Sequence, residues 1–263
     1  MGRILLHLYG PFAIYSYGLF IAIAAFLFVY CLSRDIRFKR LQLEDTFSSI
    51  FMVGVASILL GGRLLHLLAV HDTIIQPIDF IAFWQPGFSI LGSIIGLLIC
   101  VPLYLIWCKI PVLSFFDLIA TYAGLLQGIS RIGCFFAGCC FGTITTCLWG
   151  IIYNDPDSSA PLHMILHPVQ LYSAILLLLI FIFMYTVARR TLPIAGQQTA
   201  LYLMLCSLER FITDFWRGDR DFFNGLTISL SIHQTIALAI FISACILMGC
   251  VTIVGKKHQY EHI

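Results

Sequence analysis

The sequence predicts an all-α integral membrane protein, a bundle of about seven transmembrane helices. The chain has 263 residues, of which 60% are hydrophobic and 11% charged, and its mean hydropathy is +0.97. Soluble domains carry about a quarter charged residues, so most of this surface must face lipid. The apolar residues also fall into runs of about 20, the length that an α-helix needs to cross the hydrocarbon core.

Seven apolar runs follow one another between polar breaks. They lie at about 11–33, 46–70, 88–108, 113–134, 168–188, 196–216 and 229–254. The first is too long for a signal peptide, lacks a small-residue cleavage pattern and precedes its basic stretch, so we expect a retained helix. Without internal repeats, we expect a single polytopic membrane domain over 1–263. The longest polar connection, about 135–167, predicts a small extracytoplasmic cap.

Basic residues predict the orientation of the bundle. With seven spans, one side receives nine of them: Arg34, Arg37, Lys39, Arg40, Lys109, Arg189, Arg190, Lys256 and Lys257. The other side has Arg3, Arg217 and Arg220 beside several acids. Cytoplasmic loops carry the excess of Lys and Arg, so the N-terminus is expected outside and the C-terminus in the cytoplasm. No basic run is long enough to follow a phosphate backbone, and we expect no nucleic-acid partner.

Three further arginines lie inside or at the edge of apolar spans. They are Arg63, Arg131 and Arg210, and an arginine at the bilayer centre costs at least about 3 kcal/mol on insertion scales. In the expected topology all three lie in the outer half of the membrane. Each could extend to the headgroups or pair with an acid such as Asp214. A shared anionic ligand is the alternative, because guanidinium binds phosphate in a bidentate fork, and at this depth the phosphate belongs to a phospholipid.

The segment from Gly128 to Gly142 resembles the signature of bacterial prolipoprotein diacylglyceryl transferases. Six other segments resemble motifs of the same family, in the same order along the chain. They are 16–19, 61–64, 89–96, 167–172, 209–217 and 230–234. Each motif is short, but the seven together cover nearly the whole chain.

The resemblance implies a specific enzyme. Such a transferase moves the diacylglyceryl group of phosphatidylglycerol to the lipobox cysteine thiol of a prolipoprotein signal peptide. A thioether forms and glycerol phosphate leaves, which is the first step of bacterial lipoprotein maturation. The expected location is the bacterial cytoplasmic (inner) membrane, with the active site towards the outer leaflet. The expected partners are phosphatidylglycerol, prolipoprotein signal peptides and membrane lipid, and the family implies neither a metal nor an organic cofactor.

Matching by motif position assigns the candidate site residues. Arg131 is the signature arginine and the expected phosphate ligand, Arg210 a second essential arginine, and Tyr17 the essential tyrosine of the first helix. Asp214 stands where the family has a glutamate and is expected to orient Arg210, which lies on the same helix face. The other residues expected to bind substrate are Arg63, Gly92, Gly142, Gln170, Tyr172 and Gln234.

Several positions depart from the family pattern. Leu91 replaces the histidine of a His-Gly-Gly motif, Cys134 an asparagine, Cys139 a glutamate, and Ser173 the glutamate that follows Gln-Leu-Tyr. Leu91 cannot accept a proton, so another group would have to generate the substrate thiolate.

His167, which we include among the catalytic candidates, and His233 lie at a suitable depth for this role. Each could instead be an interfacial residue hydrogen-bonded to a loop. An alternative function is therefore a relative that binds phospholipid or lipoprotein without transfer. A transporter or a thiol oxidoreductase is disfavoured, because the chain has no repeated half and no Cys-x-x-Cys pair.

Four of the ten cysteines, Cys134, Cys139, Cys140 and Cys147, gather near the outer end of the fourth span. Because the outside is oxidising, we expect one structural disulfide here, whose pairing the sequence leaves open. A catalytic thiol at Cys139 or Cys140 is an alternative. A zinc site is another, although the Cys-x₄-Cys-Cys spacing is not a usual ligand pattern, and we assign no metal ligands.

Overall fold

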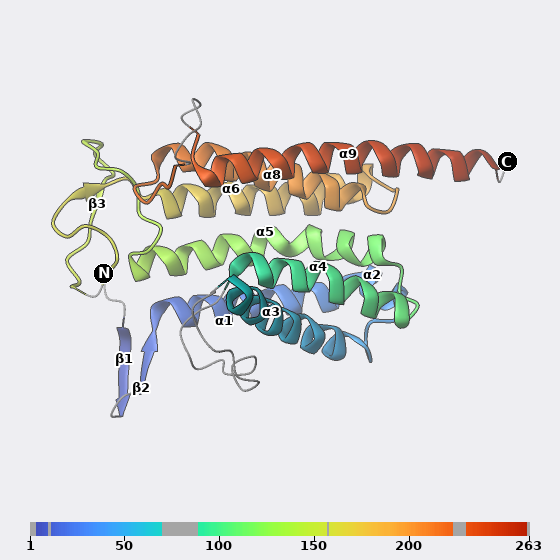
Figure 1. Cartoon of the computed structure of the whole chain (residues 1–263), viewed down its shortest axis with the longest axis horizontal. Helices are drawn as coiled ribbons and strands as arrows, with labels where there is room; N and C mark the ends of the chain where they lie inside the picture. The colour runs from blue at the N-terminus through green and yellow to red at the C-terminus, as the bar shows by residue number, and fades with distance from the viewer. Residues whose placement is uncertain (1–3, 10–11, 70–88, 157, 223–229, 262–263) are drawn as a thin grey trace. The chain divides into compact units, whose positions relative to one another are not determined.

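The computed structural model describes residues 4–9, 12–69, 89–156, 158–222 and 230–261 (Figure 1). Arg3, used above for the topology, lies outside them. Each of the seven predicted spans contains a long helix. These helices are α1 (Ser16–Arg34), α3 (Phe47–Ala69), α4 (Ile90–Trp107), α5 (Val112–Ala137), α6 (Val169–Phe183), α8 (Gln197–Thr213) and α9 (Ile232–Glu261).

The prediction of an all-α membrane protein is confirmed, although the number of full-length spans differs from seven. Among the described residues, α1, α3, α5, α6 and α9 are long and apolar enough to cross a membrane, α6 with the help of its continuation to Thr191. The apolar part of α4, Leu91–Trp107, is shorter. Helix α8 has 17 residues and carries Glu209 and Arg210. The polar residues of α8 therefore lower its hydropathy below that of the other helices.

Smaller elements complete the chain. Helix α6 continues through a π-helical turn (Met184–Ala188) into the short α7 (Arg189–Thr191), and a short α2 (Ile36–Arg40) follows α1. Before α1, the strands β1 (Ile4–Tyr9) and β2 (Phe12–Tyr15) pair antiparallel. The predicted start of the first span at residue 11 is therefore wrong by several residues. A short apolar run cannot by itself distinguish a strand from a helix.

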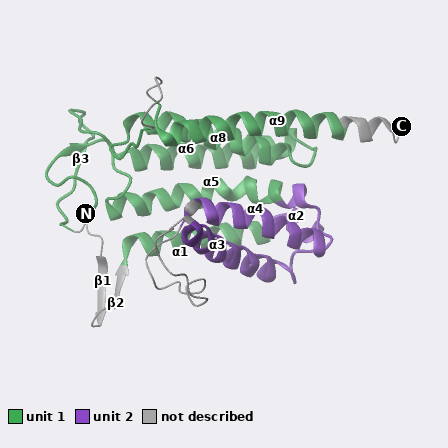
Figure 2. Ribbon diagram, viewed as in Figure 1, with its two compact units in different colours: residues 1–34, 116–263 green, residues 35–115 purple. Residues whose placement is uncertain are grey.

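The chain forms two compact units (Figure 2). Unit 1 contains residues 1–34 and 116–263, and unit 2 contains residues 35–115. The expectation of a single membrane domain remains a prediction.

In unit 1, glycines on α5 let neighbouring helices approach closely. A Cβ added at Gly124 would lie 2.7 Å from the carbonyl oxygen of Leu177 on α6, and one at Gly133 would lie 2.9 Å from the Cβ of Phe20 on α1. The rings of Phe20 and Phe136 stack at 5.2 Å beside that second contact. Small residues allow this packing in lipid, where water does not drive the association of helices.

A buried carboxylate fixes the start of α8. Asp117 on α5 is 4% exposed and accepts hydrogen bonds from the backbone nitrogens of Gly196 and Thr199, both at 2.7 Å. The hydroxyl of Thr199 adds a third bond at 2.6 Å. The first backbone N–H groups of a helix lack intrahelical partners, so this carboxylate satisfies them and holds α8 on α5.

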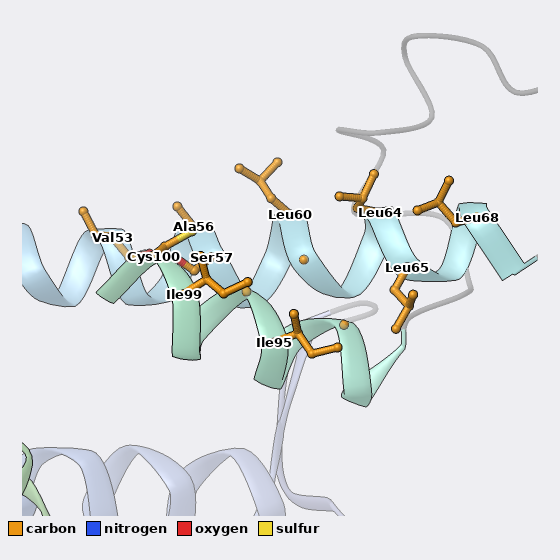
Figure 3. Close-up of a pocket in the computed structure, with 13 residues that line it drawn as sticks. Val53, Ala56, Ser57, Leu60, Leu64, Leu65, Leu68, Ile95, Ile99 and Cys100 are labelled. Atoms are coloured by element: carbon orange, nitrogen blue, oxygen red, sulfur yellow. Dashed lines mark hydrogen bonds between the residues drawn. The ribbon is translucent and has the colours of Figure 1, made fainter. Parts of the chain in front are cut away.

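In unit 2, α3 and α4 pack closely against each other at glycine residues. A Cβ at Gly92 would lie 2.2 Å from the carbonyl oxygen of Gly61, and one at Gly96 would lie 2.5 Å from that of Ser57. An apolar groove of about 580 Å³ runs along this helix pair (Figure 3). Leu60, Leu64 and Ile95 are among the side chains that line it.

The connection between α5 and α6 carries the strands β3 (Ile151–Ile152) and β4 (Ile165–Leu166), which pair antiparallel. Tyr153, Ala160 and Leu166 form a small buried core beneath them. The hydroxyl of Tyr153 donates to the carbonyl oxygen of Phe135 at 3.0 Å. This connection therefore has a core of its own, and it is anchored to the end of α5.

Candidate functional site

Three arginines of unit 1 line one small cavity. Arg131 comes from α5, Arg210 from α8, and Arg217 from the segment that follows α8. The other lining residues are Cys140, Val169, Gln170, Ser173 and Thr213. We call this the arginine cavity. Its volume is about 10 Å³, which accommodates about one water-sized group, so a phosphate can bind only after the side chains move apart.

Backbone pairing places Arg217 at the cavity. Gly142 and Arg217 form an antiparallel bridge, and the nitrogen of Gly218 donates to the carbonyl oxygen of Phe141 at 2.9 Å. A Cβ at Gly142 would lie 2.4 Å from the carbonyl oxygen of His167. Gly142, predicted as a substrate-binding residue, therefore lets two segments close around it and brings Arg217 beside Cys140.

Asp214 anchors a buried polar network behind the cavity. This carboxylate is fully buried and lies 4.0 Å from the guanidinium of Arg210 and 3.4 Å from that of Arg220. It also accepts a hydrogen bond from the hydroxyl of Ser231. Gln234, also fully buried, accepts from Arg220 at 2.9 Å. Asp214 thus lies at ion-pair distance from Arg210 without a hydrogen bond from it, whereas Gln234 contacts Arg220 and does not line the arginine cavity.

Within the part of the chain that the structure describes, the arginine cavity is lined by three guanidinium groups and by no carboxylate. Arg217 pairs with Asp219 through bonds of 2.6 and 2.8 Å, and Arg210 shares Asp214. Arg131 makes no ion pair with a carboxylate among the described residues. Guanidinium groups repel one another more strongly where water is scarce. An anion in the cavity would remove this repulsion.

Gln170 holds the turn next to the arginines. It is 1% exposed, and its Nε2 donates to the carbonyl oxygen of Cys139 at 2.8 Å and to the hydroxyl of Tyr153 at 3.2 Å. Its Oε1 is buried without a hydrogen-bond partner in the described structure. The side chain therefore supports the Cys139–Cys140 turn and leaves one acceptor unused beside the arginine cavity.

A buried carboxylate lies next to the cavity on α8. Glu209 is 5% exposed and accepts a hydrogen bond from the hydroxyl of Ser173 at 2.5 Å and one from that of Thr213 at 3.4 Å. Ser173 stands at the position where the resembling family has a glutamate. A carboxylate is therefore present in this region, but it comes from α8 instead of α6.

Three cysteine thiols adjoin the arginine cavity. The Sγ atoms of Cys134, Cys139 and Cys140 lie within 4.8 Å of one another, and we call them the thiol cluster. Hydrogen bonding to the Cys134 and Cys139 thiols, with the nearby charges of Arg217 and Arg131, lowers the pKa of Cys140 far below its usual range. Hydrogen bonding to Cys134 and Cys140 raises the pKa of Cys139. The three thiols thus interact with one another and lie close to the charges of Arg217 and Arg131.

The predicted disulfide is not formed. All ten cysteines have free thiols. Cys147, one of the four considered for the disulfide, is not part of the thiol cluster. The turn after α5 folds Cys139 and Cys140 back towards Cys134, with Gly138 and Cys140 at φ +69° and +58°. The turn therefore brings the Cys134, Cys139 and Cys140 thiols close together, and no disulfide crosslinks the α5–α6 connection.

Other predicted residues of unit 1 lie outside the arginine cavity. Tyr17 is 43% exposed and lines a neighbouring cavity of about 380 Å³ together with Cys139. His167 Nδ1 lies 3.2 Å from the hydroxyl of Tyr172, which also accepts from Trp149 at 2.7 Å. His167 and Tyr172 thus form an aromatic pair at the start of α6. The Nδ1 of His233 is buried without a partner in the described structure.

The predicted residues of unit 2 lie on its two long helices. Arg63 on α3 is 2% exposed. Gly92 packs against Gly61, as described above, and Leu91 is 61% exposed. The expected roles of Arg63 and Gly92 in binding remain predictions.

Two residues of the region were missed from the sequence. From the sequence, Arg217 is predicted only as a charge of an outer loop, and no site role is predicted for Glu209. Both lie in the segment 209–217 that resembles a family motif, so the motif contained the signal. What the sequence did not show was the pairing of Arg217 with Gly142.

The match to a family model decides the family. The model described as prolipoprotein diacylglyceryl transferase matches residues 3–250. The chain belongs to this family. A protein of Clostridium tetani named phosphatidylglycerol–prolipoprotein diacylglyceryl transferase is 35% identical over 239 residues, which are 90% of this chain and 93% of that protein.

Other relatives are similar to this chain along nearly their whole length. A Clostridium perfringens protein with the same name and the number 2 is 33% identical over 94% of this chain and 95% of its own. A Bordetella avium protein of that name is 31% identical over 90% of each chain. The family and the apolar helices together establish a multi-pass membrane protein.

Proposed function

We propose that this protein transfers the diacylglyceryl group of phosphatidylglycerol to the lipobox cysteine of prolipoprotein signal peptides. Family membership supports the reaction class, since the relatives named above carry phosphatidylglycerol and prolipoprotein in their names. The observation that carries the proposal is the arginine cavity. Its three guanidinium groups include Arg131, which makes no ion pair with a carboxylate among the described residues.

The chemistry fits an arginine site. The substrate thiolate attacks the glycerol carbon that bears the phosphate ester, a carbon–sulfur bond forms, and the carbon–oxygen bond to phosphate breaks. Glycerol phosphate leaves with the electron pair of that bond, and the thiol proton goes to a base. Negative charge grows on the leaving phosphate, where preorganised cationic donors stabilise a transition state most effectively. We assign Arg131 and Arg210 to this phosphate, with Asp214 orienting Arg210.

The expected environment follows from the topology predicted by the basic residues. The arginine cavity lies near the α5–α6 connection, which is extracytoplasmic if the C-terminus is cytoplasmic. The proposed location is thus the bacterial inner membrane, with the site towards the outer leaflet. Phosphatidylglycerol and a translocated signal peptide are both present at that level.

A transfer assay tests the proposal. Purified protein receives phosphatidylglycerol and a peptide with a lipobox cysteine, and the peptide mass is followed. We expect a mass gain of one diacylglyceryl group that depends on Arg131. No gain, with phosphatidylglycerol still bound and lost in Arg131→Ala, would contradict transfer and support the second candidate, a lipid-binding relative. Leu91 favours that candidate, because it stands where the family has a histidine.

A further inference from the structure

The thiol cluster has no part in the proposed transfer. It consists of Cys134 at the end of α5 with Cys139 and Cys140 in the following turn, and the three Sγ atoms lie within 4.8 Å of one another. Cys134 is 8% exposed, and the other two are partly buried. We propose that these three sulfurs bind one thiophilic metal ion, Zn(II) or Cu(I).

The spacing of the sulfurs fits such an ion. A metal about 2.3 Å from each of three sulfurs holds those sulfurs about 3.8–4.0 Å apart. The observed separations, all within 4.8 Å, need small side-chain rotations to reach this value. Thiolate ligands select zinc and Cu(I), whereas calcium and magnesium require oxygen ligands. The proposal is therefore specific to soft metal ions.

The backbone of the turn brings the three cysteines together before any ion binds. The nitrogen of Cys139 donates to the carbonyl oxygen of Cys134 at 3.2 Å, and the Cys139 carbonyl accepts from Gln170 at 2.8 Å. Cys140 has a φ of +58°, a left-handed conformation that non-glycine residues adopt rarely and that persists where the surrounding structure fixes it. A preorganised turn reduces the entropy lost when ligands close around an ion.

Charge and access also suit a metal ion. Three thiolates and a divalent ion have a net charge of −1, or −2 with a monovalent ion, and Arg131 and Arg217 line the arginine cavity on the side of Cys140. On the side of Cys139 is the cavity of about 380 Å³ lined by Tyr15, Tyr17, Ala137 and Ser159. This cavity gives an ion access, and it has room for the water that completes the tetrahedral coordination of zinc.

Metal titration of the full-length protein in detergent tests the site. The protein is purified under reducing, metal-free conditions and receives either Zn(II) or Cu(I) alone. After gel filtration, the metal is quantified per chain, and thiol alkylation is mapped by mass spectrometry. We expect one ion per chain for at least one of the two metals. Cys134, Cys139 and Cys140 should be protected from alkylation, and Cys147 should stay reactive.

Two variants separate this site from other thiols. Cys139→Ser combined with Cys140→Ser should weaken binding at least ten-fold, and Cys147→Ser should leave it unchanged. Equal binding by the double variant, or no protection by either metal, would each overturn the proposal. If the double variant does not fold, the protection pattern of the unsubstituted protein decides. Metal content is read independently of transfer, so a failed transfer assay does not affect this result.

Discussion

Two glycine-flanked arginines have contrasting surroundings. On α3, Gly61 and Gly62 precede Arg63, which is 2% exposed and has partners within the protein. On α5, Gly128 and Gly133 flank Arg131, which lines the arginine cavity and makes no ion pair with a carboxylate in the described part of the chain. Similar sequence patterns thus surround a fully buried arginine in unit 2 and a cavity-lining arginine in unit 1.

The glycines have the same role in both segments. Added Cβ atoms at Gly61, Gly128 and Gly133 would each approach a neighbouring helix within 3.0 Å. The glycines near these arginines therefore indicate close helix packing, and they do not indicate a bound ligand. An arginine that lines a cavity with other arginines and makes no ion pair is the more useful sign of an anion site.

Replacing Arg131 should have the largest effect on the chemistry. We expect Arg131→Ala to lower kcat/KM for diacylglyceryl transfer about 10²–10³-fold, as does the loss of one preorganised donor to a developing anion. Mass spectrometry of the peptide product over time measures the rate. Arg190→Ala is the matched control, because Arg190 is exposed on α7. Equal losses in the two variants would contradict a specific role for Arg131.

Replacing Gly92 should affect folding more than chemistry. The Cβ of Gly92→Ala would lie 2.2 Å from the carbonyl oxygen of Gly61, so α3 and α4 must separate, at a cost of about 1–3 kcal/mol in unfolding free energy. Reversible unfolding in mixed micelles measures this cost. Gly54→Ala on α3 is the control, since its Cβ would meet only Val101 Cγ2, at 3.9 Å. A Gly92→Ala protein as stable as Gly54→Ala would contradict the packing described for unit 2.

Much of the fold could be predicted from the sequence. Apolar runs of about 20 residues can be satisfied in lipid only by helices or closed barrels, which is why all seven runs correspond to helices. The hairpin before α1 was missed because its apolar strands continue the hydropathy of the helix. Two of the seven helices fall short of the length and composition of a full span.

The candidate site was predictable only in part. Arg131 and Arg210 were expected at one depth, and the structure brings both to one cavity. Arg217 reaches it through a backbone bridge to Gly142, a long-range pairing that no local pattern encodes. The prediction of a disulfide was wrong, since all the cysteines have free thiols. The left-handed turn at Cys140, which brings neighbouring cysteines together, could not be predicted from their spacing in the sequence.

Replacing Ser173 should lower the stability of unit 1, which contains Arg131, and leave unit 2 unchanged. Ser173→Ala removes the 2.5 Å hydrogen bond to Glu209 and leaves that buried carboxylate with one donor fewer, which we expect to cost about 1–3 kcal/mol in unfolding free energy. Glu209→Gln combined with Ser173→Ala should cost less than the sum of the two single changes. Additive costs would show that the two side chains do not interact.

Replacing Tyr153 should have an effect confined to the α5–α6 connection. The Tyr153 hydroxyl donates to the carbonyl oxygen of Phe135 at 3.0 Å and accepts from Gln170 at 3.2 Å, so it joins the end of α5 to the α5–α6 connection. Tyr153→Phe keeps the buried ring and removes these bonds, at an expected cost of about 0.5–1.5 kcal/mol each. Hydrogen exchange should show faster opening of the Cys139–Cys140 turn and unchanged protection of α3 and α4. Loosening in both units alike would mean that this hydroxyl supports the whole molecule and not the turn that follows Arg131.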